Sequence, residues 1–168
     1  MFQHPVRSPA HRRKRGSVGV EGALALLPLT AIMFGVLDIS VAILVKNTMQ
    51  LAVRQGVRYA VTSQTLNGMG QDRSIKTVVQ KYSLGFLQYM YPDSDPLDRI
   101  AVTYYDPVTL APLTGAGSNS GGNIVVVSAT GLSWAWLVPL LRSVTPLQFS
   151  VSSADLMEAT PVAGPPAR

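Results

Sequence analysis

The chain has 168 residues, room for one modest domain and an appendage, and it contains no cysteine. The lack of cysteine excludes disulfides, thiolate metal sites and cysteine nucleophiles, and it is compatible with an exported domain that packing alone stabilises. The formal charge is +5, and it comes from five cations that precede residue 16, because nine cations beyond that point balance nine acids. No basic stripe with interleaved aromatic residues follows, so we do not expect nucleic-acid binding.

The N-terminal residues end in the basic block "RRKRG" at positions 12–16, immediately before a long apolar run. A short cationic block in this position favours an orientation in which the block stays in the cytoplasm and the following chain crosses the membrane. We therefore interpret residues 1–16 as a basic cytoplasmic leader.

The apolar run has its two acidic residues, Glu21 and Asp38, near its ends. Residues 22–37 contain no charge and only one polar residue, Thr30. As a helix this stretch would span about 24 Å, slightly less than the ~30 Å hydrocarbon core of a bilayer. A cleaved secretory signal is the alternative, but its apolar region should be shorter and should end in a small-x-small site. We predict that residues 17–45 form the transmembrane half of a long helix.

The same helix is expected to continue outside the membrane as an amphipathic extension over residues 46–61. Apolar or small residues recur at helical spacing along one face, and a polar row runs along another. The apolar positions are Met49, Ala52, Val53, Gly56, Val57 and Ala60, and the polar row is Gln50, Arg54 and Arg58. One helix from about residue 17 to residue 61 would be about 65–70 Å long, and its apolar stripe would have to pack against a domain.

Residues 62–158 are predicted to form that domain outside the cytoplasm. We expect a helix that Asp72 caps and that ends near Tyr89, then strands at 99–106, 123–130 and 147–157. The connection at 107–122 is rich in turn residues, and residues 132–144 are apolar and aromatic, with Pro139 opposing a long regular helix. We expect residues 159–168 to be a disordered tail. This order predicts an α+β fold, with a small antiparallel sheet against the outer half of the long helix.

Both histidines, His4 and His11, lie in the leader, so the predicted domain has neither histidine nor cysteine. This excludes Ser-His-Asp and Cys-His sites and histidine-ligated zinc in that domain, and we expect no enzyme and no cofactor. Asp93, Asp95 and Asp98 are weak calcium candidates, because they are oxygen ligands at close spacing. Their pattern fails the EF-hand template, and acid-rich turns are common.

Glu21 admits two interpretations. In the first, both acids lie near the membrane faces and reach into the headgroups, which avoids the cost of roughly 2.5–3.5 kcal/mol for a charge at mid-bilayer. In the second, cleavage after Gly16 makes Ser17 the new N-terminus and places Glu21 one helical turn from a cationic amine, its own or a neighbour's. Two buried charges would then be paired. Asp38 lies about 100° around the helix and cannot serve the same contact.

Several motifs resemble those of the TadE-like pseudopilins, minor pilins of the tight-adherence (Flp) branch of type IV pili. Basic residues, Gly16 and a glutamate at the fifth following position are similar to the family's prepilin peptidase signal, although Gly22 stands where an aromatic residue is usual. "LLPLTAIMFGVLDIS" resembles the family's Leu-Pro and Phe-Gly-x-x-acid pattern, with Asp38 in the acidic place. "NTMQLAVRQGVRYAV" resembles a second family stretch, which carries over to Asn47, Gln50, Ala52, Arg54, Gly56, Arg58, Tyr59 and Ala60. Residues 123–158 show a looser resemblance.

The resemblance implies a type IV pilin-like fold and a structural role in pilus assembly, priming or tip formation for adherence. The precursor would be a single-pass protein of the bacterial inner membrane, with its N-terminus cytoplasmic and its domain periplasmic or extracellular. Prepilin peptidase would cut after Gly16, and the protein could enter the pilus. The implied partners are the major Flp pilin, other minor pseudopilins and the pilus assembly platform. Two alternatives stay open: a single-span protein that keeps residues 1–16 and carries a small binding domain, and a type II secretion pseudopilin.

Overall fold

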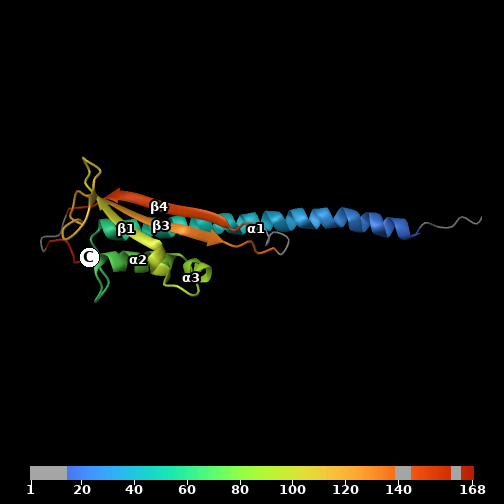
Figure 1. The fold of residues 1–168 in the computed structure, drawn as a ribbon, viewed down its shortest axis with the longest axis horizontal. Coiled ribbons are helices and arrows are strands. Elements are labelled where there is room, and N and C mark those ends of the chain that lie inside the picture. Colours follow the sequence, from blue (N-terminus) through green and yellow to red (C-terminus); the bar gives the residue numbers. More distant parts are fainter. Residues whose placement is uncertain (1–14, 139–144, 160–163) are drawn as a thin grey trace, which may run out of the picture.

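The computed structural model describes residues 15–138, 145–159 and 164–168, and it shows one long helix that projects from a small α+β domain (Figure 1). The predicted α+β class and the long N-terminal helix are confirmed. The elements in chain order are α1 (Arg15–Val61), α2 (Gln71–Tyr82), α3 (Phe86–Met90), the 3-10 turn η1 (Pro96–Arg99), β1 (Ile100–Tyr105), β2 (Pro112–Leu113), β3 (Ile124–Trp134) and β4 (Leu147–Leu156).

Helix α1 is continuous over 47 residues, which corresponds to about 70 Å. It includes Pro28, which cannot donate a backbone hydrogen bond, and it remains helical on both sides of that residue. The first half of α1 projects away from the domain, whereas the second half lies against the sheet and α2 (Figure 1). The helix therefore has two environments along one uninterrupted axis.

The sheet has four antiparallel strands in the order β2-β1-β3-β4. The three predicted strands are present, and the two-residue strand β2 lies in the connection that we expected to be rich in turns. Strand β3 extends to Trp134, four residues beyond the predicted end at residue 130. The extension follows an irregularity in the pairing between Ala129 and Leu132, where Gly131 adopts a φ of 65° that glycine accommodates without a steric cost.

The core forms between one face of the sheet and the two helices, with α1 against β3 and β4 and α2 against β1. The apolar stripe predicted for the outer half of α1 is buried, as the pattern indicated. The buried residues of this stripe are Met49, Ala52, Val53, Gly56, Val57 and Ala60. The sheet contributes Ile100, Tyr104, Val125, Val127, Ala129, Leu132 and Val151. Each strand alternates, so these side chains share one face.

The single helix expected between Asp72 and Tyr89 is instead two helices, and Asp72 is not its cap. Gly70 is the N-cap of α2, and Asp72 lies in the first turn. Helix α2 ends at Tyr82, with Ser83 as its C-cap, because the next two residues, Leu84 and Gly85, have φ angles of 53° and 81° in the left-handed region. The break changes the helical phase, and Tyr89, near which the single helix was expected to end, is 65 % exposed.

The C-terminal residues 164–168 differ from the expected disordered tail, because they pack against the start of α2. The backbone N–H of Gln71 donates to the carbonyl oxygen of Ala167 at 2.7 Å, and the side-chain amide of Asn119 donates to that of Pro166 at 2.8 Å. Gly70 leaves room for this segment, since a Cβ there would lie 2.5 Å from the carbonyl carbon of Arg168. Residues 160–163 of the expected tail lie outside the described residues.

Candidate functional site

The N-terminal half of α1 presents apolar side chains on all sides. Residues 19–29 are exposed throughout, and up to residue 37 no residue is buried. The exposed large side chains are Val20, Leu24, Leu26, Leu27, Leu29, Ile32, Met33, Phe34, Val36 and Leu37. In the described part of the chain, α1 is the one helix long and apolar enough to cross a membrane, with a mean hydropathy of 2.2 over its most apolar window. Because water disfavours such a surface, the sequence and the structure together indicate a lipid or protein environment for it.

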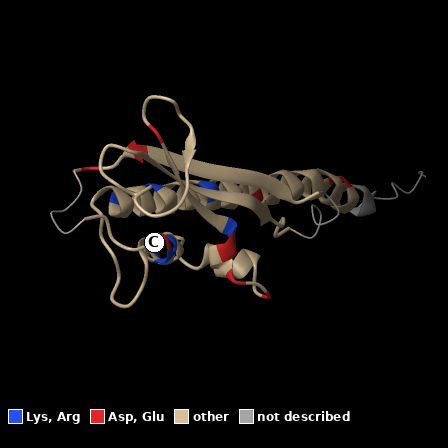
Figure 2. Ribbon diagram, turned by 60° about the vertical axis from the view of Figure 1, so that its left-hand side comes forward, with Lys and Arg blue, Asp and Glu red and all other residues tan. Residues whose placement is uncertain are grey.

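The predicted processing residues lie at the beginning of this projecting half. The backbone of Gly16 and Ser17 is in the first turn of α1, and Glu21 follows one turn later with an exposed side chain. Figure 2 shows the charges gathered on the domain and on the outer half of α1, with one acidic residue near the described start of the helix. The predicted membrane half is therefore nearly free of charge apart from Glu21 and Asp38.

Asp38, the second acid of the apolar run, is buried against its own domain, with only 1 % of its surface exposed. Its two carboxylate oxygens accept hydrogen bonds from the backbone N–H groups of Leu137 and Val138, each at 3.1 Å. These donors lie about 100 positions later in the chain, in the connection that follows β3. Two charge-assisted bonds to consecutive N–H groups fix this connection to one level of the helix.

The motif residues of the outer half divide between the core and the surface. Asn47, Arg54 and Arg58 are exposed on the face of α1 that turns away from the sheet. Gln50, predicted to share their polar row, is instead half-buried, and its side-chain amide donates to the carbonyl oxygen of Ser152 in β4 at 2.9 Å. The two arginines thus remain available to a partner, whereas Gln50 attaches the edge strand to the helix.

At Gly56, α1 and α2 approach each other closely. A Cβ at this position would lie 2.4 Å from Cγ2 of Val79, closer than real Cβ atoms approach a neighbour. Val79 is fully buried, and its branched side chain has little rotamer freedom in a helix. Glycine is therefore required here for the packing of the two helices.

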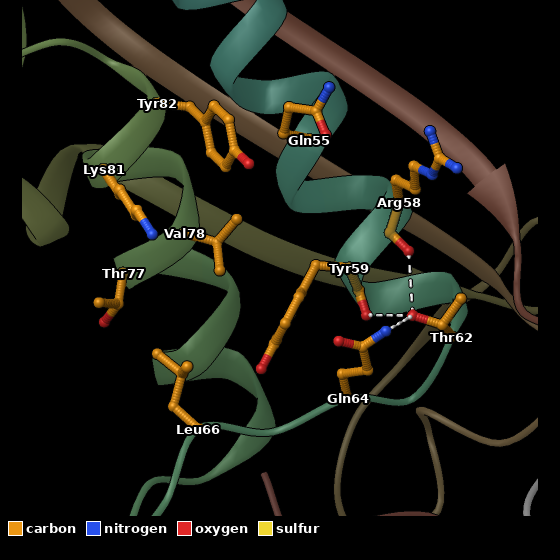
Figure 3. Close-up of a pocket in the computed structure, with 10 residues that line it drawn as sticks. All are labelled: Gln55, Arg58, Tyr59, Thr62, Gln64, Leu66, Thr77, Val78, Lys81 and Tyr82. Atoms are coloured by element: carbon orange, nitrogen blue, oxygen red, sulfur yellow. Dashed lines mark hydrogen bonds between the residues drawn. The ribbon is translucent and has the colours of Figure 1, made fainter.

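Tyr59 lines a pocket of about 460 Å³ between α1 and α2 (Figure 3). The other lining residues are Gln55, Arg58, Thr62, Gln64, Leu66, Thr77, Val78, Lys81 and Tyr82. In Figure 3 the ammonium group of Lys81 points toward the pocket, whereas the guanidinium group of Arg58 points away from it. Two cationic residues, of which only Lys81 directs its charge toward the pocket, line it together with several neutral polar groups, and this lining does not by itself define a ligand.

A second polar cluster joins the C-terminal residue to the domain. Arg168 donates two hydrogen bonds to one carboxylate oxygen of Asp72, at 3.0 and 2.8 Å, and its guanidinium group lies 4.7 Å from the ring centroid of Tyr104. The Tyr104 hydroxyl donates to the other oxygen of Asp72 at 2.9 Å. Burial raises the pKa of the Tyr104 hydroxyl well above its ordinary value of 10, and the adjacent Asp72 carboxylate raises it further.

The three weak calcium candidates do not form a site that could hold the ion. The described residues contain no group of three or more acidic, histidine or cysteine side chains with metal-binding geometry. Asp95 has a local role instead, because its carboxylate accepts a hydrogen bond at 2.9 Å from the backbone N–H of Leu97 and so caps η1. The structure gives the calcium hypothesis involving Asp93, Asp95 and Asp98 no support.

Sequence reasoning missed the contacts of Asp38, Asp72 and Arg168, since each joins parts of the chain that are far apart. Asp38 offered one usable signal: a carboxylate in an apolar helix needs donors, and the apolar segment after β3 has backbone N–H groups to supply. Asp72 and Arg168 offered no such signal, because Asp72 occurs in a polar segment and Arg168 follows the proline-rich stretch "AGPPA", and neither context indicates a partner.

Comparison with known proteins identifies one segment. Residues 16–58 match the model of the family described as TadE-like protein, which confirms the resemblance over this segment. The match covers the projecting half of α1 and the part of the outer half that carries Asn47, Gln50, Arg54, Gly56 and Arg58. No curated protein and no solved structure matches the chain.

Proposed function

Since α1 carries a TadE-like segment over residues 16–58, we propose that this chain is a minor pseudopilin of a Tad (Flp) pilus system. In this proposal prepilin peptidase cuts the precursor after Gly16, and the mature protein acts in pilus assembly, priming or tip formation for adherence. The family match suggests a protein associated with the Tad pilus, and the finer role is our inference from the geometry of α1.

The observation that carries the proposal is the division of one helix into two surfaces. The first half is apolar and exposed on all sides, whereas the second half buries one stripe and leaves Arg54 and Arg58 exposed. A helix with this division can lie in a bilayer in the precursor and in a bundle of apolar helices after assembly. In both settings the domain stays outside the apolar layer and presents the exposed arginines to polar partners.

Glu21 would set the axial position of each subunit relative to its neighbours in that bundle. After cleavage its carboxylate would lie one turn beyond the new amine of Ser17, and in a bundle it could receive the amine of a neighbouring subunit. A buried carboxylate costs several kcal/mol unless it is paired, so a subunit at the wrong height would be disfavoured. The charge pair therefore selects the axial position, and apolar packing supplies most of the attraction.

We further propose that the precursor is a single-pass inner-membrane protein with its N-terminus in the cytoplasm and its domain outside. Its partners would be prepilin peptidase, the assembly platform, the major Flp pilin and other minor pseudopilins. The role is structural and not enzymatic. A domain of about 100 residues on the pilin-like helix favours a priming or tip component over a bulk filament subunit.

The intact mass of the protein recovered from bacterial membranes tests the proposal. Loss of residues 1–16, with or without N-methylation of Ser17, is the expected result. A protein that keeps its basic leader would instead be the plain single-span anchor with a small external binding domain.

The Glu21→Ala variant tests the assembly role. We expect it to insert into the membrane and to be processed, but to leave the cells without pili, because only the assembled helix needs the charge pair. The matched control is Glu158→Ala, which changes the chain's other glutamate, an exposed residue beyond β4. Normal numbers of pili in the Glu21→Ala strain would remove this residue from the mechanism.

A further inference from the structure

The connection that follows β3 lies beside α1 at the level where the projecting half ends. Figure 1 shows β3 directed toward the N-terminal half of α1, and the described residues that follow β3, 135–138, continue in that direction. The Asp38 carboxylate holds the backbone N–H groups of Leu137 and Val138, so the level of the connection on the helix is fixed. No residue before Asp38 is buried among those of α1 whose side chains are described.

The connection exposes apolar surface at this level. Leu137 is 44 % exposed, and Trp136 and Val138 are half-buried. The Trp136 ring packs beside the cluster formed by Ala42, Val45 and Trp134, and its indole N–H donates to the carbonyl oxygen of Thr145 at 3.0 Å. The polar edge of the indole thus has a partner, and tryptophan is a residue type that is enriched at membrane–water interfaces.

The length of the charge-free run supports a lipid environment for this surface. Residues 22–37 span about 24 Å as helix, roughly 6 Å less than a ~30 Å hydrocarbon core. On the side away from the sheet, Ile39, Ile43 and Leu44 continue the apolar surface and are each more than half exposed. On the domain side, the Asp38 carboxylate would end the apolar surface of α1. The connection after β3 covers this carboxylate and places Leu137 beside it.

We propose that residues 136–138 contact the outer surface of the bilayer, with Asp38 as the residue that positions them there. This contact extends the apolar surface on the domain side of α1, which the charge-free run alone leaves shorter than the hydrocarbon core. It also places the domain directly on the membrane in the precursor. Removal of the helix from the membrane during assembly would therefore also have to separate this surface from lipid. The proposal rests on α1 spanning a membrane, which is part of the proposed function.

The absence of cysteine from the chain makes a direct test available, because any introduced cysteine is the sole thiol. We would attach a nitroxide spin label to Leu137→Cys in the full chain, reconstituted in phosphatidylcholine–phosphatidylglycerol vesicles. The measurement compares collisions with oxygen, which concentrates in lipid, and with a water-soluble nickel complex. Two matched positions provide the scale: Ile32→Cys on the projecting half of α1 and Val108→Cys, which is 88 % exposed on the turn between β1 and β2.

The expected result is an oxygen-to-nickel ratio at Leu137 that is several-fold above the ratio at Val108 and below the ratio at Ile32. A ratio at Leu137 equal to that at Val108, with Ile32 in lipid, would overturn the proposal while leaving the membrane span intact. A water-exposed label at Ile32 would instead overturn the span, and with it the proposed function.

The positioning role of Asp38 is tested in the same assay. Adding Asp38→Ala to the Leu137→Cys chain removes the acceptor of both backbone N–H groups, so the ratio at Leu137 should fall toward the Val108 value. An unchanged ratio would show that lipid contact does not depend on Asp38.

A label-free measurement uses lipids brominated near the headgroup, which quench the fluorescence of nearby tryptophans. The quenching of Trp136 in a Trp134→Phe chain should be stronger than the quenching of Trp134 in a Trp136→Phe chain.

Discussion

Asp38 illustrates how a single carboxylate can be tolerated in an apolar helix. The chain surrounds it with its own domain and supplies two backbone N–H donors, so the charge is neither in lipid nor without partners. Hydrogen bonds to a charged group are each worth about 1.5–3 kcal/mol net, and a buried donor that loses its acceptor adds a desolvation cost. Asp38 therefore contributes to the stability of the domain as well as to its placement.

Replacing Asp38 with alanine should lower the free energy of unfolding of the domain by about 2–3 kcal/mol, because two partly buried N–H groups lose their charged acceptor. Urea unfolding of the full chain in detergent micelles, followed by tryptophan fluorescence, measures this change. Ser40→Ala is the control, since its exposed hydroxyl bonds only within α1, and it should leave the midpoint unchanged. Equal midpoints for the Asp38→Ala and Ser40→Ala chains would contradict the assigned contact.

Tyr104 gives the domain a specific dependence on alkaline pH. Its pKa is raised in the folded state by burial and by Asp72, so the folded protein keeps the hydroxyl protonated where the unfolded chain has begun to ionise. The contribution of Tyr104 to the free energy of unfolding is fully present below the pKa of a tyrosine in the unfolded chain, about 10. It is lost as the pH rises above that value, by up to about 1.4 kcal/mol per pH unit.

The Tyr104→Phe chain should therefore be less stable than the parent at pH 8 by about 1 kcal/mol, the net value of the lost bond to Asp72. Because phenylalanine cannot ionise, this difference should shrink between pH 10 and pH 11. Urea midpoints of both chains across pH 8–11 provide the measurement, and the other titrating groups, being common to both, cancel in the difference. A constant difference across this range would show that the Tyr104 pKa is not raised.

At the scale of elements, the contact between α1 and α2 depends on the absence of a side chain at Gly56. Gly56→Ala gains up to about 1 kcal/mol in helix propensity, but overpacking against Val79 costs about 1–3 kcal/mol. We expect a net loss of about 1 kcal/mol in the urea unfolding of the full chain. Gly35→Ala, where no atom lies within 4 Å of the added carbon, should show no such loss.

A second substitution distinguishes packing from a general effect of alanine. Val79→Ala removes the atom that the new Cβ would meet, so the cost of Gly56→Ala should disappear in the double variant. If the loss of stability in the double variant instead equals the sum of the losses in the two single variants, the cost of Gly56→Ala does not come from contact with Val79.

The helices and strands show which features could be predicted from the sequence. The long helix and its buried stripe were predictable, because apolar residues at helical spacing report one face over many turns, as from Met49 to Ala60. The break at Leu84 was not, because a leucine in a left-handed conformation has no local sequence signal. The contact of Arg168 was also not predictable, and the sequence indicated only that Asp38 needs donors and not which backbone groups supply them, since both contacts depend on how distant segments meet after folding.

At the scale of the whole molecule, one face of α1 is left uncovered by the described part of the domain. Beyond the apolar half this face carries Asn47, Arg54 and Arg58, all exposed, together with Leu51, which is half exposed. Because the sheet and α2 occupy the other sides of the helix, a neighbouring subunit in a helical bundle would meet α1 along this face (Figure 1). Its two cations would favour an acidic or polar partner surface.

Changing both Arg54 and Arg58 to glutamate should therefore block assembly without unfolding the domain. Like charges across an interface cost several kcal/mol, whereas exposed charges contribute little to stability. The readout is the amount of pilus sheared from cells, with the urea midpoint as the folding measurement. The matched control reverses Arg73 and Lys76 on α2, which makes the same change in net charge on a different surface. If the control reduces piliation as much as the α1 variant, net charge and not this face governs assembly; if only the α1 variant does, the uncovered face is where subunits meet.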